Sequence, residues 1–434
     1  MLKRSDMTRR ERLQALGRQG LIAALDVGST KITCFIARPE PPREAGGPSL
    51  RIVGIGHQVS RGLKAGQVTD LGEAEEAIRR TVETAEHMAG ALIHRVFLGV
   101  TCPTLASVHV GAGLVIGERD LTEADVTRVL AMARSRAPSG DGAILHAVPA
   151  RYTVDGTTGI REPAGMFAGE ISADVNVVTV AHAPARNLTH AVERCHLEIA
   201  GLIATPYASA ISTLIEDECE LGTLLLDMGG GTTSLAIMAE GRLQYVACLP
   251  VGGQHVTMDL ARGLSTTLSH AERLKTLCGS ALRSPTDDRE PVSVPQAGED
   301  ERESAVQVPR SILTGIIRPR IEETLELVRD RLEASGFAHM VGRRMVMTGG
   351  ASQLNGVKEL AEHILGRQVR IGRPAGVAGL AEATGGPAFA AAAGLLAFPL
   401  CAPFEAPRGD GIQGRLSLLA PLDRMSRWLK ASGW

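Results

Sequence analysis

Asp26-Val27-Gly28-Ser29-Thr30-Lys31 and Asp227-Met228-Gly229-Gly230-Gly231-Thr232-Thr233 are the two stretches that decide the fold of this 434-residue chain. Each stretch lies between two apolar runs that are typical of strands. A strand, a tight glycine turn and a second strand form a β-hairpin. The sequence therefore predicts the same hairpin twice, about 200 residues apart, as a weak internal duplication.

The residue types in both turns suit a phosphate chain. Glycine lets the backbone come close enough for its N–H groups to donate to phosphate, and hydroxyls and a lysine add further donors. Asp26 and Asp227 each end a strand, where a carboxylate can hold the water shell of Mg²⁺. Neither turn matches GxxxxGK[ST], and each leads into a strand, which excludes a Walker A loop and a dinucleotide fingerprint. The predicted phosphate-binding residues are Asp26, Gly28, Ser29, Thr30, Lys31, Asp227, Gly229, Gly230, Gly231, Thr232 and Thr233.

Two further segments are candidates for the nucleoside part of a nucleotide. Residues 345–356 predict a strand, a Gly349-Gly350-Ala351 turn and a helix that includes Asn355, and small residues there let a purine and ribose lie against the backbone. Glu272 and Lys275 are three apart and share a helix face. Alone they would be interpreted as a surface ion pair. With the two hairpins they complete a predicted site for ATP and Mg²⁺, with Asp26 and Asp227 acting on the metal through water.

The composition limits the remaining possibilities. A chain of this length predicts at least two domains, and 44% hydrophobic with 22% charged residues is typical of a soluble protein. The net charge of −2 does not point to nucleic acid. The seven cysteines include no CxxC pair, which favours a reducing cytoplasm over zinc or disulfides. No apolar window is long enough to span a membrane, and residues 388–400 predict a buried, closely packed helix.

These segments, in this order, resemble the superfamily that unites actin, the heat-shock chaperone ATPases and the sugar kinases. Within it the chain is similar to the FtsA family of bacterial cell-division proteins, from about Leu21 to its end. The resemblance rests on 191–195 (AVERC), 224–232 (LLLDMGGGT), 348–351 (TGGA) and 368–372 (QVRIG). It implies a two-lobed α/β fold with an inserted α+β subdomain. It also implies an actin homologue that polymerises, tethers the tubulin-like FtsZ ring to the cytoplasmic face of the cell membrane at midcell, and recruits later division proteins.

The resemblance also implies a division into subdomains. We expect a basic tail at 1–20, subdomain IA at 21–100 and 182–221, and subdomain IC at 101–181. Subdomain IC is expected to contact other division proteins and neighbouring copies in a filament. Subdomain IIA is expected at 222–252 and 319–400, and subdomain IIB at 253–318. A linker at 401–414 and an amphipathic helix at 415–434 complete the chain.

The C-terminal segment predicts a peripheral membrane anchor. At about 100° per residue, Leu418, Leu422, Met425 and Leu429 form one stripe, with Pro421 and Trp428 at its edge. The basic residues Arg427 and Lys430 flank or oppose that stripe. Such a helix after a Gly/Pro-rich linker is typical of a lipid interface. The alternative is a helix docked on the protein's own core.

One departure from the related ATPases concerns activity, and a set of arginines concerns partner binding. Thr205 stands where hydrolysing chaperone relatives carry a carboxylate, and we find no catalytic residue, so we expect slow ATP hydrolysis or none. ATP would then act as a conformational ligand. Glu216–Glu218 lie nearby and are expected to face solvent. In subdomain IIB, Arg310 and Arg318 are candidates to bind carboxylates of the acidic FtsZ peptide, while Arg320 could instead pair with Glu322 or Glu323.

Two alternatives stay open at this point. One is a small-molecule kinase or ATPase of the same superfamily, and the other is a scaffold like the pilus-biogenesis protein PilM. The C-terminal helix separates them best, because a kinase has no use for it and a PilM-type protein docks to a membrane partner's peptide instead.

Overall fold

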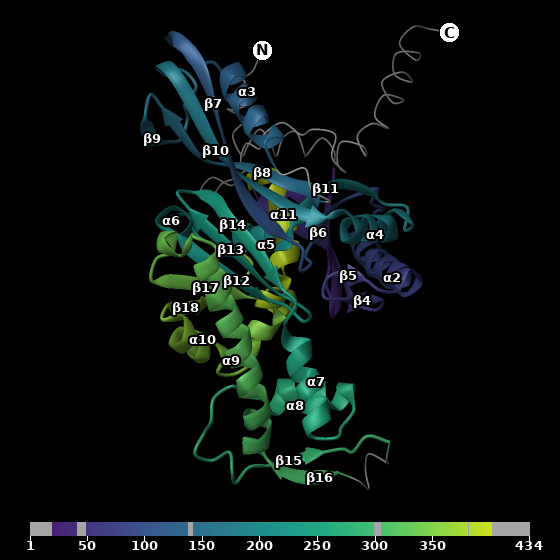
Figure 1. Cartoon of the computed structure of the whole chain (residues 1–434). Coiled ribbons are helices and arrows are strands. Elements are labelled where there is room, and N and C mark those ends of the chain that lie inside the picture. The colour runs from purple at the N-terminus through teal and green to yellow at the C-terminus, as the bar shows by residue number, and fades with distance from the viewer. Residues whose placement is uncertain (1–19, 41–48, 138–141, 299–304, 381, 402–434) are drawn as a thin grey trace, which may run out of the picture.

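The computed structural model describes residues 20–40, 49–137, 142–298, 305–380 and 382–401. The predicted C-terminal helix, the linker beyond Cys401 and residues 1–19 of the predicted tail lie outside these ranges. Figure 1 shows two lobes side by side, with a small subdomain at each end of the molecule. Among the described residues, no helix has the length and hydropathy needed to cross a bilayer.

The first lobe is built on a six-stranded sheet in the order β11-β6-β1-β2-β3-β19. β1 pairs with β2 antiparallel and with β6 parallel, so the first predicted hairpin forms the middle of the sheet. Helices α2 and α4 pack beside it (Figure 1). Its elements are β1 (Ile22–Val27), β2 (Lys31–Glu40), β3 (Ser49–Val59), β4 (Leu63–Lys64), β5 (Gln67–Val68), α2 (Leu71–Ala89), β6 (Arg95–Val100), α4 (His182–Glu193), β11 (Glu198–Ala204) and β19 (Val377–Ala378).

The second lobe repeats this plan on a five-stranded sheet in the order β14-β13-β12-β17-β18. β12 pairs with β13 antiparallel and with β17 parallel, which matches the pairing of β1. The elements of this sheet and its helices are α6 (Glu216–Leu221), β12 (Thr223–Met228), β13 (Thr233–Ala239), β14 (Arg242–Leu249), α9 (Arg310–Ala334), η2 (Ala338–Met340), β17 (Arg344–Thr348), η3 (Gly350–Gln353), α10 (Val357–Leu365) and β18 (Gln368–Ile371).

The two end subdomains differ in composition. The upper one in Figure 1 has the four-stranded sheet β7-β10-β8-β9 and helix α3, with its own core around Val129, Leu130 and Val177. The lower one holds α7, α8 and a short hairpin. Their elements are β7 (Ala106–Asp120), α3 (Glu123–Ser135), β8 (Gly142–Val154), β9 (Thr157–Ile160), β10 (Phe167–Ala181), α7 (Gly253–Gly263), α8 (Leu268–Cys278), β15 (Pro291–Val294) and β16 (Val306–Pro309).

Two helices with small residues cross between the lobes. α5 (Thr205–Thr213) and α11 (Ala390–Cys401) contact each other, and α5 also contacts β11 and β12. They come so close that a methyl group placed on Gly394 would lie 1.7 Å from the Ala208 carbonyl oxygen. The Ser212 hydroxyl donates to the Ala390 carbonyl at 2.7 Å. The expected buried helix near residues 388–400 is therefore confirmed, and it joins the lobes.

Several predicted elements need correction. The sequence pattern of residues 187–200 predicts one helix, but helix α4 ends at Glu193 and Glu198–Ala204 form an edge strand parallel to β6. The switch happens at His196, whose φ of 60° breaks the helix. The sequence predicts short strands at residues 106–110 and 175–181, but β7 and β10 are 15 residues long and pair, with one irregularity between Ala168 and Glu170, into an extended ribbon. Residues 284–309 are not only an exposed excursion, since Val292 and Val294 of β15 are buried.

The segment around Pro319 also differs from expectation. A kink or restart is expected there, yet Arg310–Ala334 form one uninterrupted helix that contains Pro319. Glu218 does not face solvent, because it is buried and pairs with Arg370, whose Nε donates to Glu218 Oε1 at 2.6 Å. Its second oxygen accepts from the Ile215 N–H at 3.1 Å, so Glu218 both caps α6 and fixes β18.

The α5–α11 contact predicts a large effect of a single methyl group. We expect Gly394→Ala to lower the free energy of unfolding by about 1–3 kcal/mol, because the added carbon must push the helices apart. Gly315→Ala in α9 is the matched control, since nothing lies within 4 Å of a methyl group there. It should stabilise the protein by about 0.5–1 kcal/mol. Denaturant unfolding measures both, and equal effects of the two changes would contradict the packing argument.

Candidate functional site

The two glycine hairpins have the same local geometry. The Gly28 N–H donates to the Lys31 carbonyl at 3.0 Å, and the Gly229 N–H donates to the Thr232 carbonyl at 2.8 Å. The last paired residues before each turn are Val27 with Ile32 in the first hairpin and Met228 with Thr233 in the second. Each turn therefore has the same length and closure, which bears out the expected duplication.

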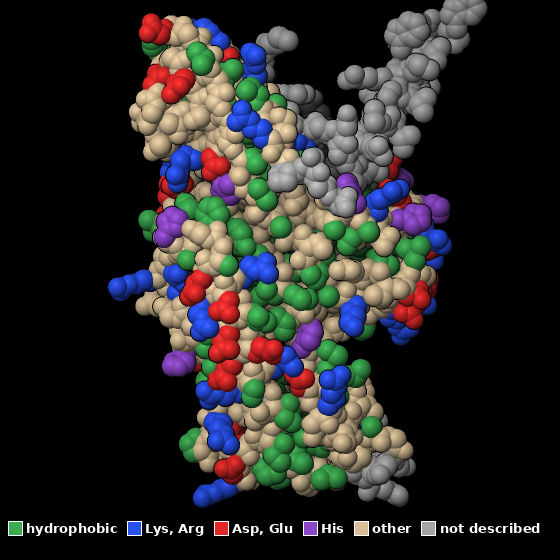
Figure 2. Space-filling model, in the orientation of Figure 1, with side chains coloured by type: hydrophobic (Ala, Val, Ile, Leu, Met, Phe, Trp, Pro, Cys, Tyr) green, Lys and Arg blue, Asp and Glu red, His purple; other side chains and the backbone are tan. Residues whose placement is uncertain are grey.

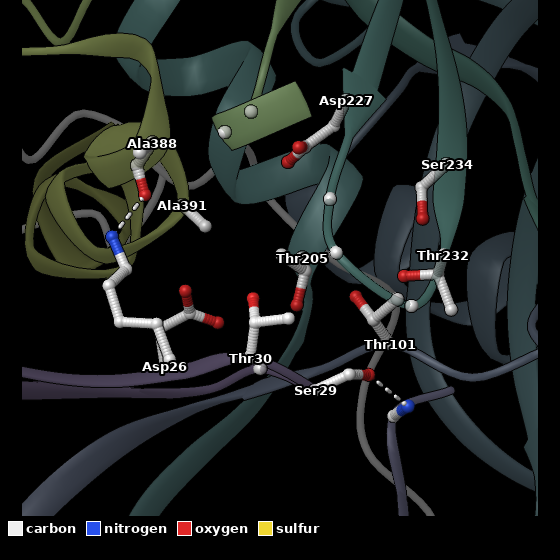
Figure 3. A pocket seen from close by; sticks show the side chains of 18 of the residues that line it. Asp26, Ser29, Thr30, Thr101, Thr205, Asp227, Thr232, Ser234, Ala388 and Ala391 are labelled. Carbon is white, nitrogen blue, oxygen red and sulfur yellow. Dashed lines mark hydrogen bonds between the residues drawn. The ribbon is translucent and has the colours of Figure 1, made fainter. Parts of the chain in front are cut away.

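The hairpins meet face to face across the cleft between the lobes (Figure 3). A methyl group on Gly230 would lie 2.4 Å from Thr30 Cγ2, and one on Gly231 would lie 2.5 Å from Ser29 Oγ. The lobes can approach this closely only because both positions lack a side chain.

A cavity of about 210 Å³ lies beside this contact. Pockets that enclose small ligands usually measure about 300–1,000 Å³, so a nucleotide would enter only as the hairpins move apart. Most of the predicted phosphate-binding residues line the cavity, and sequence reasoning missed several others. The lining residues from the prediction are Asp26, Gly28, Ser29, Thr30, Lys31, Asp227, Gly229, Gly230, Gly231, Thr232, Gly349 and Gly350. Those not predicted to bind are Val27, Gly66, Thr101, Thr205, Ser234, Pro387, Ala388 and Ala391.

The two aspartates are partly buried on opposite walls of the cavity, as Figure 3 shows. Burial raises the pKa of Asp26 to about 6, with Lys31 opposing and Asp227 adding to the rise. Burial also raises the pKa of Asp227, against a hydrogen bond from Ser209 Oγ at 2.6 Å. Both carboxylates therefore lack the compensating charge that a bound cation would supply.

Lys31 does not point at the hairpin turns in this structure. Its Nζ donates to the Ala388 carbonyl at 2.7 Å and lies 3.3 Å from the centre of the Phe389 ring. Burial lowers its pKa to about 8, although Asp26 and Asp227 both oppose the fall. Its predicted contact with phosphate would require it to exchange the carbonyl for an anion.

The donor set fits a phosphate chain with a hydrated Mg²⁺. The N–H groups of Ser29, Thr30, Gly230 and Gly231 have no hydrogen-bond partner within the described residues. The Thr101 hydroxyl is buried, lines the cavity and likewise has no partner in that part of the chain. No three His, Cys, Asp or Glu side chains gather as a metal cluster among the described residues. Asp26 and Asp227 are the carboxylates in the cavity lining that would reach the water shell of a bound Mg²⁺.

The second hairpin is held from behind by helix α7. The Gly253 N–H donates to the Gly229 carbonyl at 3.0 Å, and the Gln254 N–H donates to the Gly230 carbonyl at 2.8 Å. With its carbonyl groups fixed in this way, the loop can turn its N–H groups towards the cavity. α7 thus links the cleft to the lower subdomain.

Of the predicted nucleoside residues, Gly349 and Gly350 line the cavity, whereas Glu272, Lys275, Ala351 and Asn355 do not. Lys275 Nζ donates to the Gly253 carbonyl at 3.1 Å and to Glu272 at 2.6 Å, so this ion pair is anchored at the start of α7. A methyl group on Gly253 would lie 3.1 Å from Ala351 Cβ, which brings the third and fourth predicted segments together. Asn355 forms a bridge to Ser280 through its backbone.

Two predicted residues are placed differently from the rest. Thr233 lies in β13 with its hydroxyl buried and without a partner among the described residues, outside the cavity lining. Thr205 lies at the first turn of α5 and does line the cavity. Thr101, Ala388 and Ala391 could not be found from sequence motifs, because the end of strand β6, the short helix η5 (Pro387–Phe389) and helix α11 bring them to the cleft from distant positions.

The three arginines considered for the lower subdomain, Arg310, Arg318 and Arg320, have partners within the described residues. Arg310 donates to the Cys278 carbonyl at 2.9 Å and to Glu290 at 3.0 Å, and Arg318 donates to Glu322 at 2.7 Å. Arg320 binds Asp259 at 2.6 Å as well as Glu323, so its expected pairing with Glu323 is confirmed and a second partner is added. The predicted membrane residues 418–430 lie outside the described residues.

Two family models match the chain in the regions that carry this architecture. The model described as cell division protein FtsA matches residues 224–394. The model of the SHS2 domain inserted in FtsA matches residues 104–179, within the upper subdomain. A third, for the ethanolamine utilisation protein EutA, matches residues 162–285.

Curated relatives match almost the whole chain. The cell division protein FtsA of Agrobacterium fabrum is 45% identical over 96% of this chain and 95% of its own length. FtsA of Pseudomonas aeruginosa is 34% identical over 95% of this chain and 98% of its own. FtsA of Escherichia coli is 33% identical over 87% of this chain and 89% of its own length.

Solved structures show the actin-like fold. The PilM–PilN type IV pilus biogenesis complex gives a TM-score of 0.58 at 17% identity, over 87% of this chain and 98% of the matched one. MreB5 of Spiroplasma citri bound to ADP gives a TM-score of 0.51 at 13% identity, over 87% of this chain and 96% of the matched one. The expected two-lobed actin-like fold with an inserted subdomain is confirmed.

The hydrogen bond from Ser209 to Asp227 predicts a role for Ser209 in positioning that carboxylate. A hydrogen bond to a charged group contributes about 1.5–3 kcal/mol, so we expect Ser209→Ala to weaken Mg·ATP binding roughly tenfold. Ser212→Ala is the control, because Ser212 lies on the same helix and bonds the Ala390 carbonyl instead.

Calorimetric titration with and without Mg²⁺ measures both variants. The loss of ATP affinity in Ser209→Ala should be smaller without Mg²⁺, and Ser209→Thr should restore part of the affinity. Equal losses in both variants would show that α5 packing, and not the carboxylate, is responsible.

Proposed function

We propose that this chain, which belongs to the FtsA family of cell-division proteins, is an ATP-binding filament-forming protein that tethers the FtsZ ring to the cytoplasmic membrane. The observation that carries the nucleotide part is the meeting of two matched glycine hairpins around a cavity with a partly buried aspartate on each wall. Recruitment of later division proteins through residues 101–181 belongs to the same proposal.

The nucleotide would act as a clamp between the lobes. The free N–H groups of the two turns would bind phosphate oxygens from both sides, and Lys31 would move from the Ala388 carbonyl to the phosphates. Mg²⁺ would neutralise phosphate charge and hold its waters against Asp26 and Asp227. Glu272, Lys275, Ala351 and Asn355 would border the nucleoside. Closure of both hairpins on one ligand would fix the angle between the lobes.

The polar groups near the hairpins favour slow hydrolysis or none. Thr205 and Thr101 line the cavity with hydroxyl groups, which orient water but do not take a proton from it near neutral pH. We therefore propose ATP as a conformational ligand whose binding sets the geometry for polymerisation.

The lower subdomain offers a surface for an acidic and apolar peptide such as the FtsZ C-terminus. Figure 2 shows hydrophobic side chains gathered over this end of the molecule. Leu268 and Leu277 of α8 are 60% and 70% exposed, and Ile312 at the start of α9 is 43% exposed. Arg310 lies beside Leu277, since it donates to the Cys278 carbonyl. Arg310 and Arg318 would have to give up Glu290 and Glu322 to bind peptide carboxylates.

The membrane part of the proposal rests on the sequence of residues 415–434. Helix α11 begins beside the cavity, which Ala391 lines, and ends at Cys401, so one helix connects the proposed nucleotide site to the start of the predicted linker. A short interfacial helix binds lipid weakly, and many copies in a filament would be needed for stable attachment. The alternatives are a PilM-like scaffold or a small-molecule kinase, neither of which needs this helix.

Vesicle binding tests the tether. We expect the full chain with ATP and Mg²⁺ to co-sediment with anionic vesicles, and a chain ending at Gly414 to stay in the supernatant. Sedimentation without vesicles checks for filaments alone. Vesicle binding by the truncated chain, or none by the full chain, would overturn the tether. Fast ATP turnover that depends on a sugar or acetate would favour the kinase instead.

The exposed leucines predict where the FtsZ peptide binds. We expect Leu277→Ser to weaken the binding of a synthetic FtsZ C-terminal peptide roughly tenfold, because burying a leucine side chain contributes about 1.5–3 kcal/mol. Leu92→Ser is the control, since Leu92 is 74% exposed on the first lobe. Fluorescence anisotropy with a labelled peptide measures both. Weaker peptide binding by Leu92→Ser, or unchanged binding by Leu277→Ser, would show that the peptide does not bind at this surface.

A further inference from the structure

The subdomain formed by residues 101–181 is inserted in the first lobe but is bound to the second. β14 is an edge strand of the second lobe's sheet, and its outer backbone groups are met by side chains of β7 and β10. Asn176 Nδ2 donates to the Leu243 carbonyl at 3.1 Å, and the Val246 N–H donates to Ser107 Oγ at 2.8 Å. Side chains of the inserted subdomain therefore cap an edge that would otherwise be left unpaired.

His109 occupies the centre of this contact. Its Nε2 lies 2.7 Å from the Gln244 carbonyl oxygen, and its Nδ1 lies 2.8 Å from Asp174 Oδ2. The ring also packs on Phe337, with 4.6 Å between ring centres. Both neighbours of the ring nitrogens are acceptors, so only the doubly protonated imidazolium can donate to both at once. A neutral ring must leave one of the two bonds unmade.

The charges around the ring are few and of both signs. Asp174 faces it from β10, and Arg151 acts on it from β8 while pairing with Glu240 at 3.3 Å. β14 contributes the Gln244 carbonyl, and the segment after α9 contributes the uncharged Phe337. Burial opposes protonation of the ring, but the bonds to Asp174 and Gln244 outweigh it and raise the pKa of His109.

β14 also connects this contact to the phosphate hairpin. It pairs with β13, where Thr233 lies opposite Leu249, directly after the second glycine turn. Gly252 and α7 follow β14, and the start of α7 holds the Gly229 and Gly230 carbonyls. One strand thus has the inserted subdomain at its middle and the nucleotide cleft at its end.

We propose that His109 is a proton-dependent latch that holds the inserted subdomain on β14 and so couples its orientation to the cleft. The latch is strongest when the ring carries both protons. Folding raises the pKa of His109 above 6.5, the ordinary value for histidine. The protonated ring therefore contributes its full stabilisation at pH values below 6.5, and this stabilisation is lost as the pH rises through the pKa of the folded state. Docking of the inserted subdomain on β14 therefore weakens at pH values above the pKa of His109 in the folded protein. The proposal does not depend on ATP, lipid or FtsZ binding.

Hydrogen exchange of the full chain tests the latch. The amide protection of a peptide covering Arg242–Leu249 is measured between about pH 6 and pH 9, with labelling times corrected for the pH dependence of intrinsic exchange. We expect protection to fall at least about threefold towards high pH, because one of the ring's two bonds is lost. A peptide covering Arg344–Thr348, in the same sheet but away from the contact, should not change.

Variants separate the latch from general stability. His109→Gln should exchange this segment at the fast, high-pH rate at every pH, while His94→Gln, at an exposed histidine of the first lobe, should behave as the wild type. Asp174→Asn removes the carboxylate that raises the pKa, and should move the transition to lower pH even if His109→Gln proves poorly folded. Protection that stays constant with pH in the wild type, or a pH dependence that survives in His109→Gln, would overturn the proposal.

Discussion

The contact of Gly230 and Gly231 with Thr30 and Ser29 is the constraint on which the rest of the molecule depends. It brings the two hairpins together only because a side chain is missing at two adjacent positions. The second connection between the lobes has the same character, since Gly394 of α11 lies against the Ala208 carbonyl of α5. In both contacts a glycine leaves the space that a neighbouring group fills, so a side chain added at these positions would push the lobes apart. We propose that a nucleotide entering between the hairpins changes the first contact and with it the arrangement of the lobes.

The sequence predicts those parts of the fold and site whose signals are local. A strand, a glycine turn and a second strand are contiguous, so both hairpins and most of their cavity-lining residues follow from the residues alone. The capping box that starts α3, Thr122 with Asp125, is local in the same way. Helix α4 shows the limit, because Glu198–Ala200 suit a helix but are recruited as an edge strand by β6. Tertiary pairing outweighs weak local preference there.

The remaining site residues could not be predicted because long-range packing places them. Lys31 has an obvious role beside a phosphate turn, yet its position on the Ala388 carbonyl depends on a helix more than 350 residues later in the chain. Glu218 lies in a run of three acidic residues that is typical of a solvated surface, and only its pairing with Arg370 buries it. The capping of β14 by Ser107, His109 and Asn176 is likewise invisible in the sequence, since none of these residues belongs to a motif.

The electrostatics of the cleft explain why a metal-bound nucleotide suits it better than a free one. Two partly buried carboxylates and one partly buried lysine face the cavity, and loss of water around Asp26 and Asp227 raises their pKa values, in keeping with a poorly compensated charge. A bare polyphosphate would add negative charge to this surplus, whereas a hydrated Mg²⁺ between phosphate and carboxylates would reduce it. Lys31 cannot balance both aspartates, and while it remains on Ala388 and Phe389 it is also kept from the phosphates. Thr101 and Thr205 are not bases near neutral pH, and in the proposed arrangement Asp26 and Asp227 are occupied by the waters of Mg²⁺, so we propose that the cleft holds the nucleotide and cleaves it slowly or not at all.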